Sequence, residues 1–227
     1  MAATPEETHV TIADRIFARI QREIVEGTLK PGSKISEPEL ARAYGISRGP
    51  LREAIGRLEA CSLVVRKPNV GARVVSLSAE QLLEIYHVRE ALEGMAARLA
   101  ATAMSDAEIA DLAALLSAHR QQIESDPSHG YFQKEGDLDF HYRIVQGSKN
   151  SRLIELLCND LYHLVRLYRH QFGVISRAQR ALVEHEHIVA AIADRDGEMA
   201  ELLMRHHIRA TRANAMRRIA EREAATG

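Results

Sequence analysis

Apolar residues recur at helical spacing along most of this chain, and the first stretch that shows it lies near the N-terminus. The pattern predicts one helix over about residues 8–26 and two shorter helices within residues 36–60. The apolar stripe of the last of these helices consists of Leu51, Ile55 and Leu58. Three helices of which the last two are joined by a tight turn are typical of a helix-turn-helix.

Residues that start and end helices support this division of residues 36–60. Ser36 is expected to cap the first short helix, with Glu39 three residues later completing a capping box. Gly45 suits the left-handed residue that ends this helix, and Ser47 is expected to cap the next one.

After Ala60 the period of the pattern changes from helical to alternating. Residues 63–66 and 72–75 are short β-type runs, and residues 67–71 between them contain the proline and glycine of a turn. A hairpin directly after three helices predicts a winged helix-turn-helix domain over about residues 8–76.

From Ser78 onward the pattern is helical throughout. Capping-box matches at Ser78 with Gln81 and at Ser105 with Glu108 mark two helix starts. The expected helices span about residues 79–104, 106–124, 131–146, 151–172, 177–193 and 197–222. The fold class predicted for the whole chain is therefore mainly α, with the winged helix-turn-helix domain followed by an all-α six-helix bundle over residues 78–222.

The second helix of the helix-turn-helix carries cations and small residues on the face opposite its apolar stripe. They are Arg48, Gly49, Arg52, Gly56 and Arg57. Such a face fits a recognition helix in the DNA major groove, and the basic hairpin loop can reach the backbone or the minor groove beside it. Two short helices with a turn also occur in proteins that never bind DNA, but the hairpin and the arginines favour DNA. Arg52 can reach a guanine edge or a phosphate, and both roles stay open.

Charge and composition change this picture only slightly. Residues 1–76 carry 12 Lys and Arg against 9 Asp and Glu, and the remainder carries 18 against 22, so a mildly basic module precedes an acidic body. The two cysteines, Cys61 and Cys158, provide neither a disulfide framework nor a thiolate metal cluster. The chain shows no signal-peptide pattern and no apolar run of about 20 residues, so we expect a soluble, cytoplasmic protein.

Candidate chemistry is concentrated in histidines of the helical half. Asp137 and His141 are four residues apart and therefore neighbours on one helix face. His185 shares the register of the apolar residues around it, so it is expected to point inward. It lies about ten residues before a turn near residues 194–197, and His207 lies about ten after it, which makes them level across antiparallel helices. The four side chains can then converge as a site for Zn²⁺ or another divalent first-row ion.

Other interpretations of these histidines stay open at this point. The chain has 11 histidines, so the spacing of Asp137 and His141 could arise by chance, and a buried histidine is more often hydrogen-bonded than bound to metal. His206 fits the apolar face of the last helix almost as well as His207. A metal here could also be a structural clip or belong to an enzyme, although the sequence shows no nucleophile motif, phosphate loop or inward general base.

The run LARAYGISRGPLREAIGRLEA followed by RKPNVGARV resembles the DNA-binding domain of the GntR family of bacterial transcription regulators. By motif position, the resemblance implies DNA contacts from Ser47, Arg48, Gly49, Arg52, Lys67, Asn69 and Gly71. Two positions depart from the family pattern. Pro38 stands where some members carry a phosphate-binding arginine, and Cys61 replaces the glycine usual after the recognition helix. The first helix of the motif is therefore expected to be mainly structural.

The runs IYHVREALEGMAARLAA, DLDFHYRIV, SKNSRLIELL and EHEHIVAAIADRDGEMAELLMRHHI resemble the ligand-binding FCD domain of FadR-type members of that family. The resemblance implies a divalent ion held by Asp137, His141, His185 and His207, with zinc as first choice and nickel or manganese as alternatives. It also implies a small carboxylate effector in the open coordination positions. Arg89 is the arginine chosen to bind that carboxylate, and an outward ion pair of Arg89 with a glutamate is an equal alternative.

Together the two resemblances imply a DNA-binding transcription regulator, usually a repressor, and not an enzyme. Two copies are expected to bind a palindromic operator as a homodimer, with recognition helices about 34–36 Å apart. An organic acid bound in the bundle would shift the protein between a form that fits the operator and one that does not. No membrane partner is expected.

Overall fold

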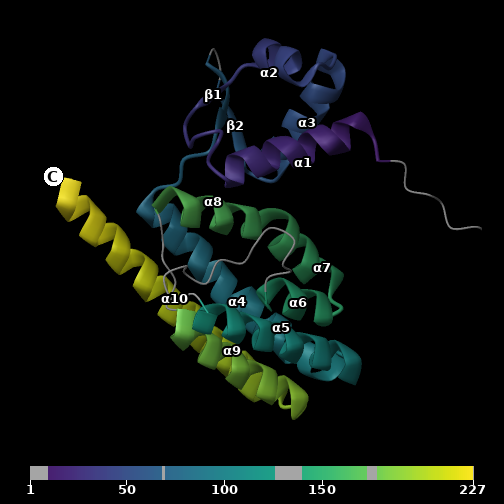
Figure 1. The fold of residues 1–227 in the computed structure, drawn as a ribbon, viewed down its shortest axis with the longest axis vertical. Coiled ribbons are helices and arrows are strands. Elements are labelled where there is room, and N and C mark those ends of the chain that lie inside the picture. Colours follow the sequence, from purple (N-terminus) through teal and green to yellow (C-terminus); the bar gives the residue numbers. More distant parts are fainter. Residues whose placement is uncertain (1–9, 68–69, 126–139, 173–177, 227) are drawn as a thin grey trace, which may run out of the picture. The chain divides into compact units, whose positions relative to one another are not determined.

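The computed structural model describes residues 10–67, 70–125, 140–172 and 178–226. The chain divides into two compact units, with the boundary between Leu77 and Ser78. The first unit combines three helices with a small sheet, and the second is built of helices in its described residues (Figure 1).

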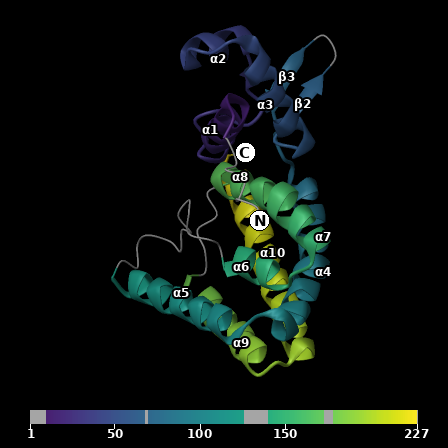
Figure 2. The ribbon, with the colours of Figure 1, turned by 90° about the vertical axis from the view of Figure 1, so that its right-hand side faces the viewer.

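Three helices and a three-stranded sheet form the first unit. The helices are α1 (Ile12–Val25), α2 (Glu37–Tyr44) and α3 (Arg48–Ala60), and the strands are β1 (Lys34–Ile35), β2 (Val64–Lys67) and β3 (Gly71–Val74). Strand β3 lies in the centre of the sheet and pairs antiparallel with both β1 and β2. The β2–β3 hairpin, seen in Figure 2, is the predicted wing. Strand β1 is not apparent in the sequence, because two residues are too few to form an alternating pattern.

The core of this unit is made by the apolar stripes that the sequence predicts. Leu51, Ile55 and Leu58 of α3 are fully buried, as are Ile20 and Ile24 of α1. Helix α1 contacts α3 more extensively than α2 does. The apolar face of α3 is therefore anchored mainly by α1, and its opposite face is left exposed.

The helix ends of this unit agree only in part with the sequence-based prediction. Gly45 ends α2 with a φ of 64°, the left-handed conformation expected there. The capping box predicted at Ser36 is wrong, because the Ser36 side chain makes no capping hydrogen bond. Ser47 is the N-cap residue of α3, as predicted, but its side chain also makes no capping hydrogen bond. Both first turns contain a proline, Pro38 and Pro50, which removes one of the N–H groups that a capping oxygen binds.

The described part of the second unit is helical. Its elements are α4 (Ala79–Ala103), α5 (Asp106–Ser125), α6 (Phe140–Gly147), α7 (Ser151–Ile154), the π-helical segment η1 (Glu155–Leu161), α8 (Tyr162–Phe172), α9 (Ala178–Ala193) and α10 (Gly197–Thr226). The capping boxes predicted at Ser78 and Ser105 are both present. Elements α7, η1 and α8 together cover the single helix expected over residues 151–172, since one short widened segment hardly shifts the apolar spacing.

The predicted fold class is confirmed, with a winged helix-turn-helix followed by a helical domain. Of the third bundle helix, expected over residues 131–146, only the part from Phe140 lies within the described residues. Across the described ranges, no helix is both long enough and apolar enough to cross a bilayer.

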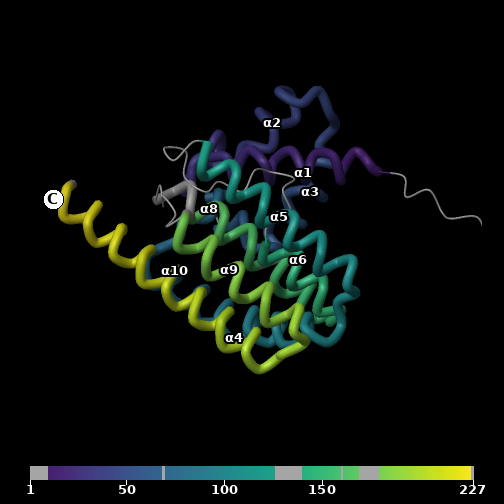
Figure 3. Tube along the Cα trace, turned by 60° about the horizontal axis from the view of Figure 1, so that its bottom comes forward, coloured from purple at the N-terminus to yellow at the C-terminus, as the bar shows by residue number. Residues whose placement is uncertain are grey.

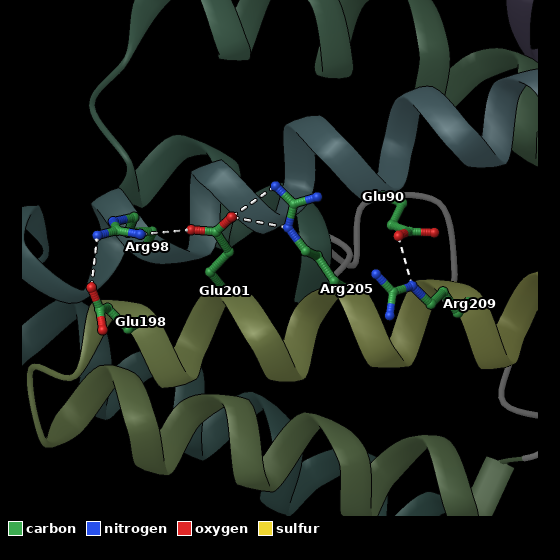
Figure 4. Close-up of polar contacts among 6 residues, drawn as sticks. All are labelled: Glu90, Arg98, Glu198, Glu201, Arg205 and Arg209. Atoms are coloured by element: carbon green, nitrogen blue, oxygen red, sulfur yellow. Dashed lines mark hydrogen bonds and ion pairs between the residues drawn. The ribbon is translucent and has the colours of Figure 1, made fainter.

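The most extensive helix contact in the second unit joins α4 and α10, which run antiparallel (Figures 1 and 3). Glycines allow the close approach: a Cβ atom on Gly197 would lie 2.9 Å from the backbone oxygen of Arg98. Ion pairs follow the outside of this contact in Figure 4, where Arg98 meets Glu198 and Glu201, and Glu90 meets Arg209. Such exposed pairs contribute little stability individually, but they match the two helices in one register.

Replacing Gly197 by alanine is expected to destabilise the second unit. The new methyl group would meet backbone that cannot move without shifting α4, so we expect a loss of about 1–3 kcal/mol in the free energy of unfolding. Gly94→Ala is the comparison variant, because the atoms nearest to its methyl group would belong to the Arg205 side chain, which can move more readily than backbone, and because a helix-interior glycine is removed. Urea unfolding followed by circular dichroism measures both, and equal stabilities would contradict a tight backbone contact at Gly197.

Candidate functional site

The residues expected to contact DNA lie at the start of α3 and in the wing. At α3 they are the N-cap residue Ser47 and, within the helix, Arg48, Gly49 and Arg52, all exposed. In the wing Lys67 is exposed at the end of β2 and Gly71 begins β3, whereas Asn69 lies outside the described residues. A hollow of about 580 Å³ lies between the end of α2 and the start of α3, lined in part by Arg42 and Arg48. An exposed helix start beside a hollow with two arginines suits contact with a phosphate backbone.

Two arginines of α3 have acidic partners that no local pattern in the sequence indicates. Arg57 donates through Nη1 to Asp14 of α1 at 2.6 Å, and its guanidinium lies 4.4 Å from the ring centre of Phe17. Arg52 donates through Nε to Glu37 of α2 at 3.0 Å. The partners are far from their arginines in sequence, so only the packing of α1 and α2 against α3 brings them together.

Three histidines from three helices converge in the second unit. They are His141 of α6, His185 of α9 and His207 of α10, each at most 3% exposed, and their potential ligand atoms lie within 4.8 Å of one another. His206 is exposed, so the choice between His206 and His207 that spacing left open falls on His207. Asp137, the fourth predicted ligand, lies outside the described residues.

The distances in this histidine cluster fit a metal ion. The Nε2 atoms of His185 and His207 are 3.2 Å apart. A tetrahedral zinc ion with Zn–N distances of about 2.0–2.1 Å places its ligand nitrogens about 3.3 Å apart, so little movement would be needed. The same distance also suits a direct hydrogen bond between the two rings in the absence of an ion. The ring of His185 stacks on Phe140 with centres 3.9 Å apart, which holds its orientation.

Two glutamates orient two of these imidazoles, and neither is among the site residues that the sequence predicts. Glu93 of α4 accepts a hydrogen bond from Nδ1 of His141 at 2.6 Å, and Glu184 of α9 accepts one from Nδ1 of His207 at 2.8 Å. A carboxylate at Nδ1 keeps the proton on that nitrogen and leaves the lone pair of Nε2 for a metal. The only sequence signal for Glu93 is its place four residues after Arg89 on the same helix face.

Arg89 is buried within the bundle, with 1% of its surface exposed. Its Nε atom donates to Oε1 of Glu93 at 2.6 Å, so Arg89, Glu93 and His141 form one continuous buried chain. The alternative of an outward ion pair is therefore wrong, because the pair with a glutamate exists but faces the interior. The Nη1 atom of Arg89 is buried without a hydrogen-bond partner in the described part of the chain, and the rings of Tyr86 and Tyr162 lie 5.2 and 5.9 Å from the guanidinium carbon.

The ionisation of these groups follows from burial and pairing. Burial alone would raise the pKa of Glu93, but the neighbouring charge of Arg89 outweighs it and lowers that pKa to about 2. Burial lowers the pKa of His207 to about 4, although the hydrogen bond to Glu184 acts in the opposite direction. Near pH 7, Glu93 is therefore ionised and His207 is neutral, which is the form of imidazole that binds a metal.

Comparison with known proteins gives two family matches. Residues 12–74 match the family described as bacterial regulatory proteins, gntR family, and residues 84–210 match the FCD domain. The uncharacterized HTH-type transcriptional regulator YdhC of Bacillus subtilis is 30% identical, over 82% of this chain and 83% of its own. The HTH-type transcriptional repressor RspR of Escherichia coli is 27% identical, over 87% of this chain and 86% of its own.

Among solved structures, that of E. coli McbR/YncC is similar with a TM-score of 0.70. The likeness covers 91% of this chain and 97% of that one, at 23% identity. At that level of identity the likeness establishes a shared fold.

Removing the carboxylate of Glu93 is expected to destabilise the second unit strongly. Glu93→Ala would leave the charge of Arg89 buried without a partner, which costs about 3–5 kcal/mol in the free energy of unfolding. Glu90→Ala is the matched control on the same helix, where the partners Arg209 and Arg212 are partly exposed and the expected loss is below about 1 kcal/mol. Urea unfolding with a chelator present, so that metal binding does not contribute, measures both. A similar loss of stability in the two variants would show that the buried hydrogen bonds of Glu93 with Arg89 and His141 stabilise the protein no more than an exposed ion pair does.

Proposed function

The chain belongs to the GntR family of bacterial regulatory proteins and carries an FCD domain, and on this premise we propose that it is a transcription repressor controlled by a small carboxylate at a metal site. The family consists of transcription regulators rather than enzymes, and its members bind operator DNA and small-molecule effectors. The observation that carries the proposal is the convergence of three buried imidazoles in the FCD domain.

Zinc is the metal that we propose, with nickel or manganese as alternatives. The three converging histidines would supply nitrogen ligands, and Asp137 would add a carboxylate oxygen. Glu93 and Glu184 support this assignment because they accept hydrogen bonds from Nδ1 of two of the rings, so that Nε2 is the nitrogen that would coordinate the ion. When bound, the ion supplies a Lewis acid with positions left for an oxygen ligand.

A small organic acid is the proposed effector, and Arg89 is its proposed partner. A buried guanidinium N–H without an acceptor is costly, and a carboxylate placed at Nη1 of Arg89 would remove that cost with a charge-assisted hydrogen bond. Arg89 is linked through Glu93 to His141, one of the proposed metal ligands. An acid bound both to the ion and to Arg89 would therefore contact the two ends of this hydrogen-bonded series.

Control of DNA binding would follow from two forms of the protein that differ in affinity for the acid. We propose a homodimer whose two α3 helices enter successive major grooves of a palindromic operator, about 34–36 Å apart. An acid that binds better to the form with a different spacing would shift the population away from the operator-binding form. The direction of regulation, repression, is supported by relatives such as RspR, which is named a transcriptional repressor.

Replacing His207 by alanine is expected to abolish zinc retention by the purified protein, because one of three converging ligands is lost. His206→Ala is the matched control, since it makes the same chemical change at the exposed neighbouring position. After zinc loading and dialysis, mass spectrometry of the metal should find about one ion per chain in the wild type and in the control, and little in His207→Ala. Equal metal content in the two variants would refute the assignment of His207 as a ligand.

Replacing Arg89 by lysine is expected to remove the response to acids while the protein stays folded. Lysine keeps the positive charge beside Glu93 but has no second nitrogen to meet an effector carboxylate. Fluorescence anisotropy of an operator duplex, titrated with mono- and dicarboxylic acids, should show release for the wild type and at least tenfold weaker release, as an order of magnitude, for the variant. Wild-type protein that ignores every acid, or that responds equally after chelation, would rule out metal-dependent sensing.

A further inference from the structure

The ion pair between Arg52 and Glu37 has a geometry that bears on how DNA sequence is read. Arg52 lies in the first half of α3 with 66% of its side chain exposed, and Glu37 is the first residue of α2. The Nε atom of Arg52 donates to Oε2 of Glu37 at 3.0 Å. In the part of the chain that the structure describes, Arg52 makes this one side-chain hydrogen bond through Nε. Its Nη1 and Nη2 atoms make no hydrogen bond there.

We propose that Glu37 is a positioning residue that sets Arg52 to read a guanine in the major groove. This inference rests on the proposed function, namely that α3 is the recognition helix. A guanidinium held at Nε still offers its Nη1–Nη2 edge, whose two parallel donors match the O6 and N7 acceptors of guanine. A phosphate contact needs no such brace, because charge alone provides it in many orientations.

The other arginine of α3 with an acidic partner shows a different arrangement. Arg57 uses Nη1 to meet Asp14 at 2.6 Å and lies over the ring of Phe17, so its donor edge is turned toward α1. That arginine joins two helices. Among the described residues, Arg52 is held at the base of its guanidinium, and its outer edge faces no protein partner there.

Glu37 also has a longer ion pair with the wing. Its Oε1 atom lies 3.7 Å from Nη1 of Arg66 in β2, and Arg66 is fixed in turn by Glu59, which accepts from its Nε at 3.0 Å. The carboxylate of Glu37 therefore lies between α3 and the wing, 20% exposed. A carboxylate set in this way reduces the rotamer freedom that Arg52 would otherwise lose on binding a base.

The position of Glu37 implies two opposite effects on DNA binding. Its negative charge lies close to where phosphates approach, so it lowers affinity for every sequence. Its hydrogen bond with Arg52 raises the affinity only for sequences that present a guanine to Arg52. A residue with both effects increases discrimination between sequences while decreasing overall affinity, and a residue with a purely structural role would do neither.

The test compares full-length wild type with Glu37→Gln and with Glu39→Gln as the matched control. Glu39→Gln removes the same charge from the first turn of the same helix, at an exposed position that makes no contact with Arg52 in the described residues. Selection from duplexes with a randomised central region first identifies the site that the wild type prefers. Affinities are then measured for that duplex, for duplexes with each guanine replaced in turn, and for a duplex of unselected sequence.

We expect one guanine in each half-site whose replacement weakens the wild type about tenfold. In Glu37→Gln this preference should fall below about threefold, while affinity for the unselected duplex rises. In Glu39→Gln the preference should stay near tenfold. Arg52→Lys, which keeps the charge but lacks the fork, should lose the same guanine preference as Glu37→Gln.

Several results would overturn the inference, and they separate it from the proposed function. A wild type that selects no sequence would disprove the DNA-binding function itself. If Arg52→Lys weakens all duplexes equally, Arg52 binds a phosphate and not a base. If Glu37→Gln is folded, as judged by its thermal unfolding, and keeps the guanine preference, then Glu37 does not position Arg52. If that variant does not fold, Glu37→Asp decides, because its shorter side chain should lose the contact with Nε and the preference with it.

Discussion

A positive charge buried in a protein interior requires a compensating negative charge, and in this protein that requirement shapes the FCD domain. Arg89 lies inside the bundle on α4, and Glu93 one turn later on the same helix accepts its Nε hydrogen bond. The second oxygen of Glu93 holds His141 of α6. One carboxylate thus neutralises a buried cation, links two helices and sets the tautomer of a proposed metal ligand. A change at any of the three side chains would be felt by the other two.

The two units use the same kind of interaction with different strength. In the winged helix-turn-helix, the pair of Arg52 with Glu37 is largely exposed, so water and salt screen it and it adds little to folding. In the bundle, the pair of Arg89 with Glu93 is almost fully buried, and loss of either partner leaves an expensive unpaired charge. A weak pair suits the proposed DNA-contacting surface, where partners must exchange. A strong pair suits a rigid support for the proposed metal site.

Much of the fold is predictable because it depends on local patterns. Apolar spacing locates the helices of both units, and the glycine and proline turn between the two β-type runs locates the wing. Where a local rule fails, a neighbouring residue bears on it: Ser36 and Ser47 begin their helices but make no side-chain capping hydrogen bond, and Pro38 and Pro50 each remove one of the N–H groups that such an oxygen binds. The short strand β1 and the π-helical segment η1 leave too little periodicity to be recognised.

Convergence of His141, His185 and His207 was predictable in outline, because helix register and the length of a hairpin set which residues of α9 and α10 are level. The residue types and their order along the chain already specify the two families that it matches, and with them the fold class and the general function. The acidic partners of the candidate site residues are decided only by tertiary structure. Glu37 and Glu93 accept hydrogen bonds from residues of other helices, Arg52 and His141, and which helices pack together depends on the whole core rather than on any local pattern.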